Sequence, residues 1–95
     1  MGNLHAPRTT NATENRHEAS PASATWLRRI IFNNHATDPV YIGTDTVTAS
    51  GATQGLKIPA GTSREIIDCQ DAIHIIADAT KTPSYTILEI SNGGF

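Results

Sequence analysis

Turn residues interrupt this chain at short and regular intervals. From residue 25 onward, segments rich in Ile, Val, Thr and Tyr alternate with Gly, Pro, Asn and Asp at spacings of roughly 8 to 12 residues. β-Branched and aromatic side chains favour strands, and no segment keeps an apolar stripe at helical spacing. The pattern predicts an all-β fold, a small β-barrel or β-sandwich of about 6–7 short strands, preceded by an extended N-terminal arm.

Each expected strand runs from one turn signal to the next. Asn33-Asn34 ends the first strand, and Pro39 begins the second, where a missing N–H is tolerated. Pro59-Ala60-Gly61 is expected to form a type I turn with Pro at its second position and Gly at its fourth. The predicted strands cover residues 26–33, 39–42, 47–48, 56–58, 64–69, 73–77 and 85–90.

Alternation within the last two strands predicts which side chains are buried. Residues 85–90 divide into a Tyr85, Ile87 and Glu89 face and a Thr86, Leu88 and Ile90 face, and we expect the second face to line the core. In the strand at 73–77, Ile73, Ile75 and Ala77 share one face, and His74 and Ile76 share the other. Because these strands are apolar on both sides, we expect some of them to pack against another chain in an oligomer.

The composition of the chain changes near residue 25. Apart from Met1, residues 1–24 contain Leu4 as their only large apolar side chain and hold no aromatic residue. Such a segment buries too little apolar surface to offset the entropy lost on ordering. We therefore predict two parts: an arm at 1–24, which makes few contacts with its own core and is ordered by neighbouring chains, and a β domain at 25–95. The candidate partner-binding residues of the arm are Leu4, Arg8 and Arg16.

Charge and hydropathy exclude several classes of partner. The 95 residues carry seven basic and nine acidic side chains, which leaves no basic field for a nucleic acid. The longest apolar runs have two or three residues, against the roughly 20 that a membrane-spanning helix needs, so we expect no membrane partner. With one cysteine, Cys69, and no apolar signal segment, we expect synthesis in a reducing cytoplasm without export.

The residue chemistry does not indicate an enzyme. Asp68, Cys69, Asp71 and His74 lie within seven residues, but a zinc site needs four ligands, with a second Cys or His pair, so we interpret them as a polar turn. No Ser lies in a Gly-x-Ser-x-Gly motif, and the glycines of residues 51–55 have no following Lys-Ser/Thr to make a phosphate loop. We expect no catalytic residues, no metal and no cofactor.

Arg28 and Arg29 fall on opposite faces of the first predicted strand. An inward Arg needs a carboxylate partner, because an unpaired buried charge is costly, and Asp78 or Glu89 could supply it. Alternatively, this strand lies at a sheet edge, where charges discourage unwanted pairing. The sequence leaves both interpretations open.

A set of short motifs spans about residues 30–91. An Asn-rich strand end is followed by Val-Tyr-Ile-Gly, a Val-Thr pair, a Gly-rich loop, Gly-Leu-Lys-Ile-Pro-Ala-Gly and a closing Ile-Leu-Glu strand. In these motifs we expect glycines 43, 55 and 61 at turns and the aliphatic residues in the core. The motif residues are Val40, Tyr41, Ile42, Gly43, Val47, Thr48, Gly55, Leu56 and Gly61.

These motifs resemble those of small β-rich virion proteins of tailed bacteriophages. The resemblance implies a structural virion protein, best described as a capsid decoration (cement) protein that stabilises the head shell, with a trimer favoured. Its partners would be the major capsid protein and other virion subunits, and it would reside in the virion after assembly in the host cytoplasm.

Two alternatives remain open. One is a head–tail connector, tail or head-fibre component. The other is a free carbohydrate-binding β-sandwich, which the scarcity of aromatic residues (Trp26, Tyr41, Tyr85 and two Phe) disfavours.

Overall fold

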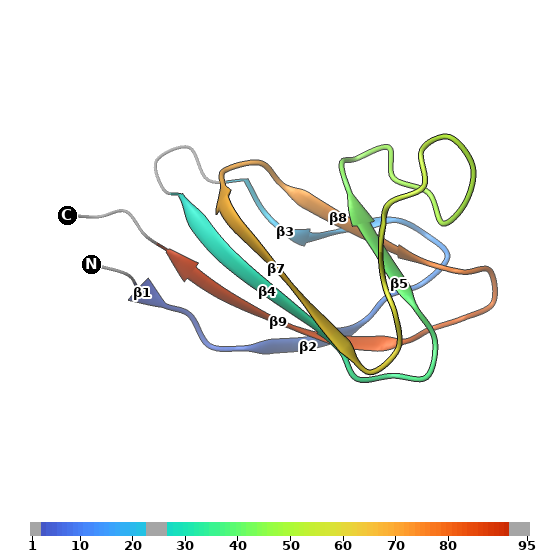
Figure 1. Ribbon diagram of the computed structural model, residues 1–95, viewed down its shortest axis with the longest axis horizontal. Helices are drawn as coiled ribbons and strands as arrows, with labels where there is room; N and C mark the ends of the chain where they lie inside the picture. Colours follow the sequence, from blue (N-terminus) through green and yellow to red (C-terminus); the bar gives the residue numbers. More distant parts are fainter. Residues whose placement is uncertain (1–2, 23–26, 92–95) are drawn as a thin grey trace.

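The protein is a sandwich of two antiparallel β-sheets (Figure 1). The computed structural model describes residues 3–22 and 27–91, which form nine strands. Sheet A has the order β1-β9-β4-β7, with β2 also pairing with β9, and sheet B has the order β3-β8-β5-β6. The strands are β1 (Asn3–Leu4), β2 (Arg8–Asn11), β3 (His17–Ser20), β4 (Arg28–Asn34), β5 (Val40–Gly43), β6 (Leu56–Ile58), β7 (Thr62–Cys69), β8 (Ile73–Ala77) and β9 (Ser84–Ser91). The predicted all-β class is confirmed.

Turn chemistry placed most of the strands correctly. The bounds of β6 and β8 are those predicted, and the other strands after residue 27 begin and end within two residues of their expected positions. The predicted strand at 47–48 is wrong, because Thr48 forms only an isolated bridge with Gln54. The predicted type I turn is also wrong: Thr62 N donates to Pro59 O at 3.2 Å, and Gly61 has a φ of 74°. The turn therefore begins at Pro59 and has the positive φ that a type II turn requires at its third position.

The N-terminal segment belongs to the sandwich. β1 and β2 pair with β9 in sheet A, and β3 pairs with β8 in sheet B, so this segment contributes to both sheets (Figure 1). The expectation that it makes few contacts with its own core is therefore wrong for residues 3–20. The side chains that this segment buries fully are small, such as Ala12 and Ser20. Because its apolar content is low, the segment is held mainly by backbone hydrogen bonds to β9 and β8. The expected boundary between residues 24 and 25 lies outside the described residues.

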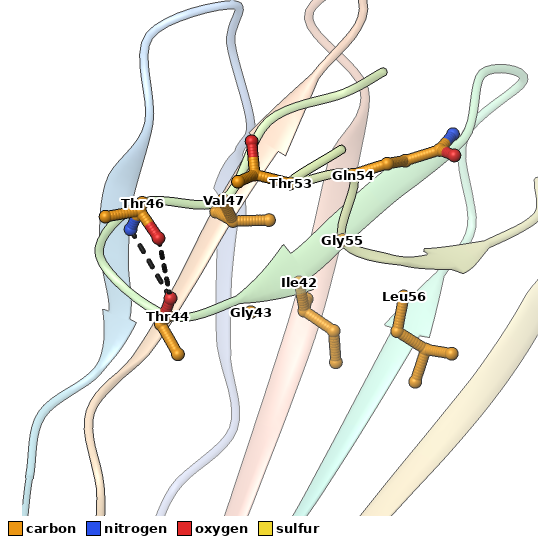
Figure 2. A pocket seen from close by; sticks show the side chains of 9 residues that line it. All are labelled: Ile42, Gly43, Thr44, Thr46, Val47, Thr53, Gln54, Gly55 and Leu56. Carbon is orange, nitrogen blue, oxygen red and sulfur yellow. Dashed lines mark hydrogen bonds between the residues drawn. The ribbon is translucent and has the colours of Figure 1, made fainter. Parts of the chain in front are cut away.

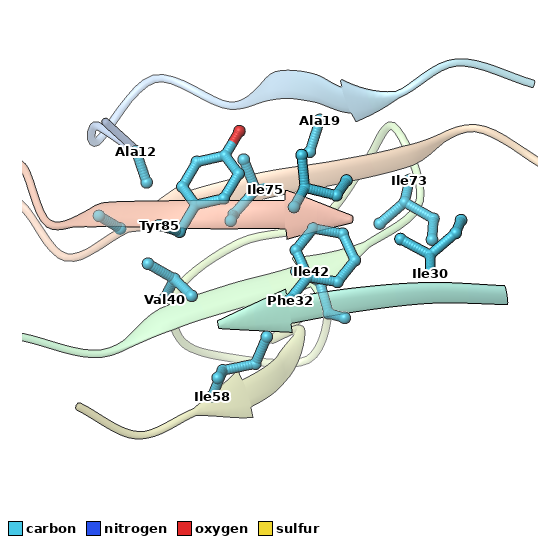
Figure 3. Packing of buried hydrophobic residues seen from close by; sticks show 12 residues of the cluster. Ala12, Ala19, Ile30, Phe32, Val40, Ile42, Ile58, Ile73, Ile75 and Tyr85 are labelled. Carbon is cyan, nitrogen blue, oxygen red and sulfur yellow. The ribbon is translucent and has the colours of Figure 1, made fainter. Parts of the chain in front are cut away.

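The core lies between the sheets and draws side chains from both (Figure 3). The Phe32 and Tyr85 rings pack with their centroids 6.2 Å apart. The prediction for β8 is confirmed, since Ile73, Ile75 and Ala77 all face this core. The cluster comprises Ala12, Ala19, Ile30, Phe32, Val40, Ile42, Ile58, Ile73, Ile75, Ala77, Tyr85 and Ile87.

The predicted face of β9 is wrong. Tyr85 and Ile87 are buried, whereas Leu88 and Ile90 lie on the half-exposed outer face. The sequence misled because Glu89 shares the buried face, and a carboxylate there is tolerated only when cations pair with it. The aliphatic face of β9 is thus left outside the core.

A loop at residues 44–55 folds over the outer face of sheet B. Val47 from this loop packs with Tyr41 and Ile76 in a second buried cluster. The loop approaches β5 so closely that a Cβ on Gly55 would lie 2.6 Å from Ile42 O, which explains the glycine there. Of the expected core residues, Val40, Ile42 and Val47 are buried, but Leu56 is 47% exposed because β6 is an edge strand.

Candidate interaction surfaces

Arg28 is buried at one end of the core. On β4 it shares the inward face with Ile30 and Phe32, and it is 5% exposed. Its guanidinium donates to Ser20 Oγ at 2.7 Å, to Asp71 O at 2.7 Å and to Cys69 O at 3.2 Å, and also to Pro21 O. Of the two carboxylates expected from the sequence, Glu89 is its partner, with Oε2 3.5 Å from Arg28 Nη1. Arg29 is exposed on the opposite face.

Glu89 ties the N-terminal strands to this site. Its side chain is 13% exposed, accepts a hydrogen bond from Ser20 Oγ at 2.7 Å and pairs with Arg8. We call Arg8, Ser20, Arg28 and Glu89 the Arg28–Glu89 cluster. Breaking a buried, hydrogen-bonded ion pair is costly because the remaining charge stays in a low dielectric. The cluster therefore fastens β2 and β3 to β9 and β4.

Among the predicted partner-binding residues, two are already engaged within the chain. Arg8 pairs with Glu89, and Arg16 Nη1 donates to Val47 O at 3.0 Å. Leu4, by contrast, is 72% exposed on β1. Only Leu4 of the three presents an unengaged side chain to a partner.

The acidic segment between β7 and β8 brings no ligand set together. Cys69 ends a strand of sheet A, whereas His74 lies in sheet B on the face opposite Ile73 and Ile75. The Cys69 thiol donates to Asp71 O at 3.4 Å. The side chain of Asp68 lies outside the described residues. In the described part of the chain, no group of three or more His, Cys, Asp and Glu side chains converges as metal ligands would.

A shallow recess of about 290 Å³ lies beside the 44–55 loop (Figure 2). Thr44 Oγ1 and Thr46 Oγ1 lie 3.1 Å apart at its rim. The nine residues that line it are uncharged and none is titratable: Ile42, Gly43, Thr44, Thr46, Val47, Thr53, Gln54, Gly55 and Leu56. The recess offers hydrogen bonds and apolar contact but no acid–base chemistry.

Both tyrosines are buried, and burial shifts their pKa values. Burial raises the pKa of Tyr41 above 10.0, and the Asp78 carboxylate raises it further. Burial also raises the pKa of Tyr85, although the Arg8 guanidinium opposes the shift. Tyr85 Oη also lies 3.0 Å from His17 Nε2. Both phenols are therefore neutral at physiological pH.

The outer face of sheet A carries half-exposed aliphatic side chains. Ile31 lies directly opposite Leu88 in the pairing of β4 with β9, and Leu4 lies opposite Ile90 in the pairing of β1 with β9. Ile67, which is 61% exposed, lies beside Arg29 at the irregularity between β4 and β7. We call Leu4, Ile31, Ile67, Leu88 and Ile90 the aliphatic patch. None of them belongs to either buried cluster.

The outer faces of the two sheets differ in whether another segment packs on them. The 44–55 loop buries the apolar side chains outside sheet B, whereas no described segment covers the aliphatic patch of sheet A. The patch also holds one ion pair, between Arg29 Nε and Glu65 Oε2 at 3.1 Å, with both side chains about half exposed. Polar residues, including Thr9 and Thr86, occupy the other end of the face. The aliphatic patch is therefore the strongest candidate for contact with another molecule.

No known family model and no curated protein matches the chain. Among solved structures, a chain of Bacillus endospore appendages, described as disulfide-linked pili, is similar with a TM-score of 0.60 and 13% identity. The match covers 99% of this chain and 88% of that chain, so the N-terminal strands are part of the shared fold. A tobacco streak virus coat protein matches over the same shares of the two chains, with 14% identity and a TM-score of 0.47. At 13% identity, the match to the spore-appendage chain shows a shared fold.

Proposed function

We propose that this chain is a structural subunit that acts by packing against other protein subunits. The aliphatic patch carries the proposal, because it is contiguous on one sheet and uncovered while the equivalent face of sheet B is buried. Scattered exposed aliphatic residues are normal, but contiguous patches mark interaction sites. The likeness to a pilus chain supports a fold that is compatible with assembly.

We propose more specifically a capsid decoration protein of a tailed bacteriophage virion. The motifs over about residues 30–91 support this assignment through their resemblance to small β-rich virion proteins. The proposed partners are the major capsid protein and other copies of the chain. Since residues 3–20 are part of the sandwich, binding is assigned to the aliphatic patch, including Leu4, and not to a draped arm. A connector, tail or head-fibre role is the alternative within this class.

The buried tyrosines argue against a carbohydrate-binding module. Sugar platforms use exposed aromatic faces, but Tyr41 is 5% exposed, Tyr85 is 2% exposed and Phe32 is fully buried. Trp26 lies outside the described residues. Within the described part of the chain, therefore, these aromatic rings serve packing.

The test compares binding to assembled shells. Wild-type protein should co-purify with shells at a fixed stoichiometry. Leu88→Lys puts an unpaired charge into the aliphatic patch, so its occupancy should fall about tenfold or more, while Thr9→Lys at the polar end should bind as wild type does. Melting temperatures establish that both variants are folded. Equal occupancy of the shells by both variants would show that the aliphatic patch is not the binding surface. Absence of wild-type binding would contradict the decoration role.

A further inference from the structure

We infer that the aliphatic patch pairs with the same patch of a second copy of the chain, about a two-fold axis that crosses the strands. The inference rests on the proposed function, because it names the partner of the same surface. Its basis is the arrangement of charge and aliphatic side chains on sheet A. A two-fold interface requires a surface that is complementary to itself.

The strand register orders the patch into two rows. One row runs Leu88, Ile31 and Glu65 across β9, β4 and β7. The next runs Ile90 and Arg29 across β9 and β4, and Ile67 follows on β7 at the register shift between Arg28 and Ile30. Each row therefore holds two aliphatic side chains and one charge, and the two charges have opposite sign.

The proposed two-fold axis runs parallel to the two rows and midway between them. Rotation about this axis places the Leu88 row of each copy over the Ile90 row of the other copy. Leu88 then meets Ile90 of the second copy, and Ile31 meets the aliphatic stem of the second Arg29. The Arg29 of the second copy then lies beside Glu65 of the first copy, about one strand spacing of 4.8 Å to the side. The two Arg29–Glu65 pairs, each 3.1 Å within its own copy, become a ring of four alternating charges. Packing sheets face to face about 10 Å apart accommodates this arrangement.

The charge pattern selects a second copy over an unrelated partner. An apolar partner would desolvate Arg29 and Glu65 without new polar contacts, whereas the two-fold arrangement gives each charge a second opposite charge. Arg29 and Glu65 are 56% and 46% exposed, so neither has to leave a buried position to join the ring. The same two residues thus fix both the register and the direction of the strands in the pair.

The size of the face predicts a weak dimer. Sheet A has three strands of seven or eight residues, β9, β4 and β7, and the shorter β1 and β2 both pair with β9. Standard strand dimensions give this face an area of roughly 450 Å² per copy. The pair then buries somewhat less than the roughly 1,200 Å² at the lower end of stable interfaces. We therefore expect dissociation constants in roughly the micromolar to millimolar range for the isolated protein, strengthened by multivalency in an assembly.

Charge reversal in solution tests the pairing without any shell. Arg29→Glu places four carboxylates in the ring, and Glu65→Arg places four cations there, so each variant alone should associate at least about tenfold more weakly than wild type. An equal mixture of the two variants juxtaposes opposite charges only between copies, and it should form a heterodimer at least as tight as the wild-type dimer. Sedimentation velocity over a concentration series measures all three.

Lys57→Glu, on exposed β6 of sheet B, and Glu14→Arg, in an exposed turn, are the matched controls. Both should associate as wild type does. If the reversals alone associate like these controls, or if their mixture stays monomeric where wild type pairs, the two-fold arrangement is wrong. Shell binding of wild-type protein in that case leaves the proposed function standing.

Discussion

Replacing Arg28 should cost a large part of the stability of the sandwich. Arg28→Met removes a guanidinium that is 5% exposed and donates to the carbonyl oxygens of Cys69, Asp71 and Pro21 as well as to Ser20 Oγ. Breaking a buried pair costs about 3–5 kcal/mol, because Glu89 keeps its charge and loses one of its two cations. A domain of this size has about 5–15 kcal/mol of stability in total, so the variant should melt roughly 12–40 °C lower.

The neighbouring arginine provides the control for this variant. Arg29→Met removes a cation that is 56% exposed, and surface ion pairs contribute about 0–1 kcal/mol. The double variant Arg28→Met/Glu89→Leu removes both buried charges and should recover part of the loss. Urea unfolding followed by circular dichroism at low protein concentration gives all three free energies. Costs for Arg28→Met and Arg29→Met that agree within about 0.5 kcal/mol would refute the reasoning.

Three further predictions follow from the packing. Gly55→Ala should lower the free energy of unfolding by about 1–3 kcal/mol, because the new Cβ would lie 2.6 Å from Ile42 O. The control Ala52→Ser, in the same exposed loop, should change the free energy of unfolding in urea by less than about 0.5 kcal/mol. Equal losses in the two variants would contradict the close approach of Gly55 to β5. Since the pKa values of Tyr41 and Tyr85 are raised in the folded state, their contribution to stability is intact below pH 10.0 and is lost as the pH rises through the folded-state values. Urea midpoints should therefore fall above that pH in wild type and fall less in Tyr41→Phe/Tyr85→Phe, and an equal fall in both would count against this cause. Deleting residues 1–22 removes β1, β2 and β3 together with two members of the Arg28–Glu89 cluster, so the remainder should lose cooperative melting; an unchanged melting transition would show that the segment is dispensable.

The strands after residue 27 could be predicted because each one is bounded by turn residues. The Pro59–Thr62 turn and the Asn33-Asn34 strand end mark boundaries that depend on local backbone preferences. The N-terminal strands carry no comparable signal. Arg8–Asn11 has an exposed side chain at every position, so its place in sheet A depends on backbone pairing with β9, which no local pattern reveals.

The proposed interaction surface could be predicted in kind, but its position on the sheet could not. The apolar character of both faces of residues 85–90 indicated contact with another chain. The face was misassigned because Glu89 appeared to mark the solvent side, and its partners come from residues 8 and 28, far away in the sequence. Once Glu89 is paired inside, the Leu88 and Ile90 face must be the outer one. That this face is left uncovered could not be predicted from the sequence, because it depends on the 44–55 loop packing on the other sheet.

Hydroxyl-radical footprinting tests most directly whether the aliphatic patch is buried in an assembly. Labelling of Leu88 and Ile90 would be compared between dilute protein and protein assembled at high concentration or on shells. Leu56 is the internal reference, because it is 47% exposed at the edge of sheet B, outside the patch. The account predicts that labelling of Leu88 and Ile90 falls severalfold on assembly while that of Leu56 stays constant. Unchanged labelling of Leu88 and Ile90 in the assembled protein would contradict it.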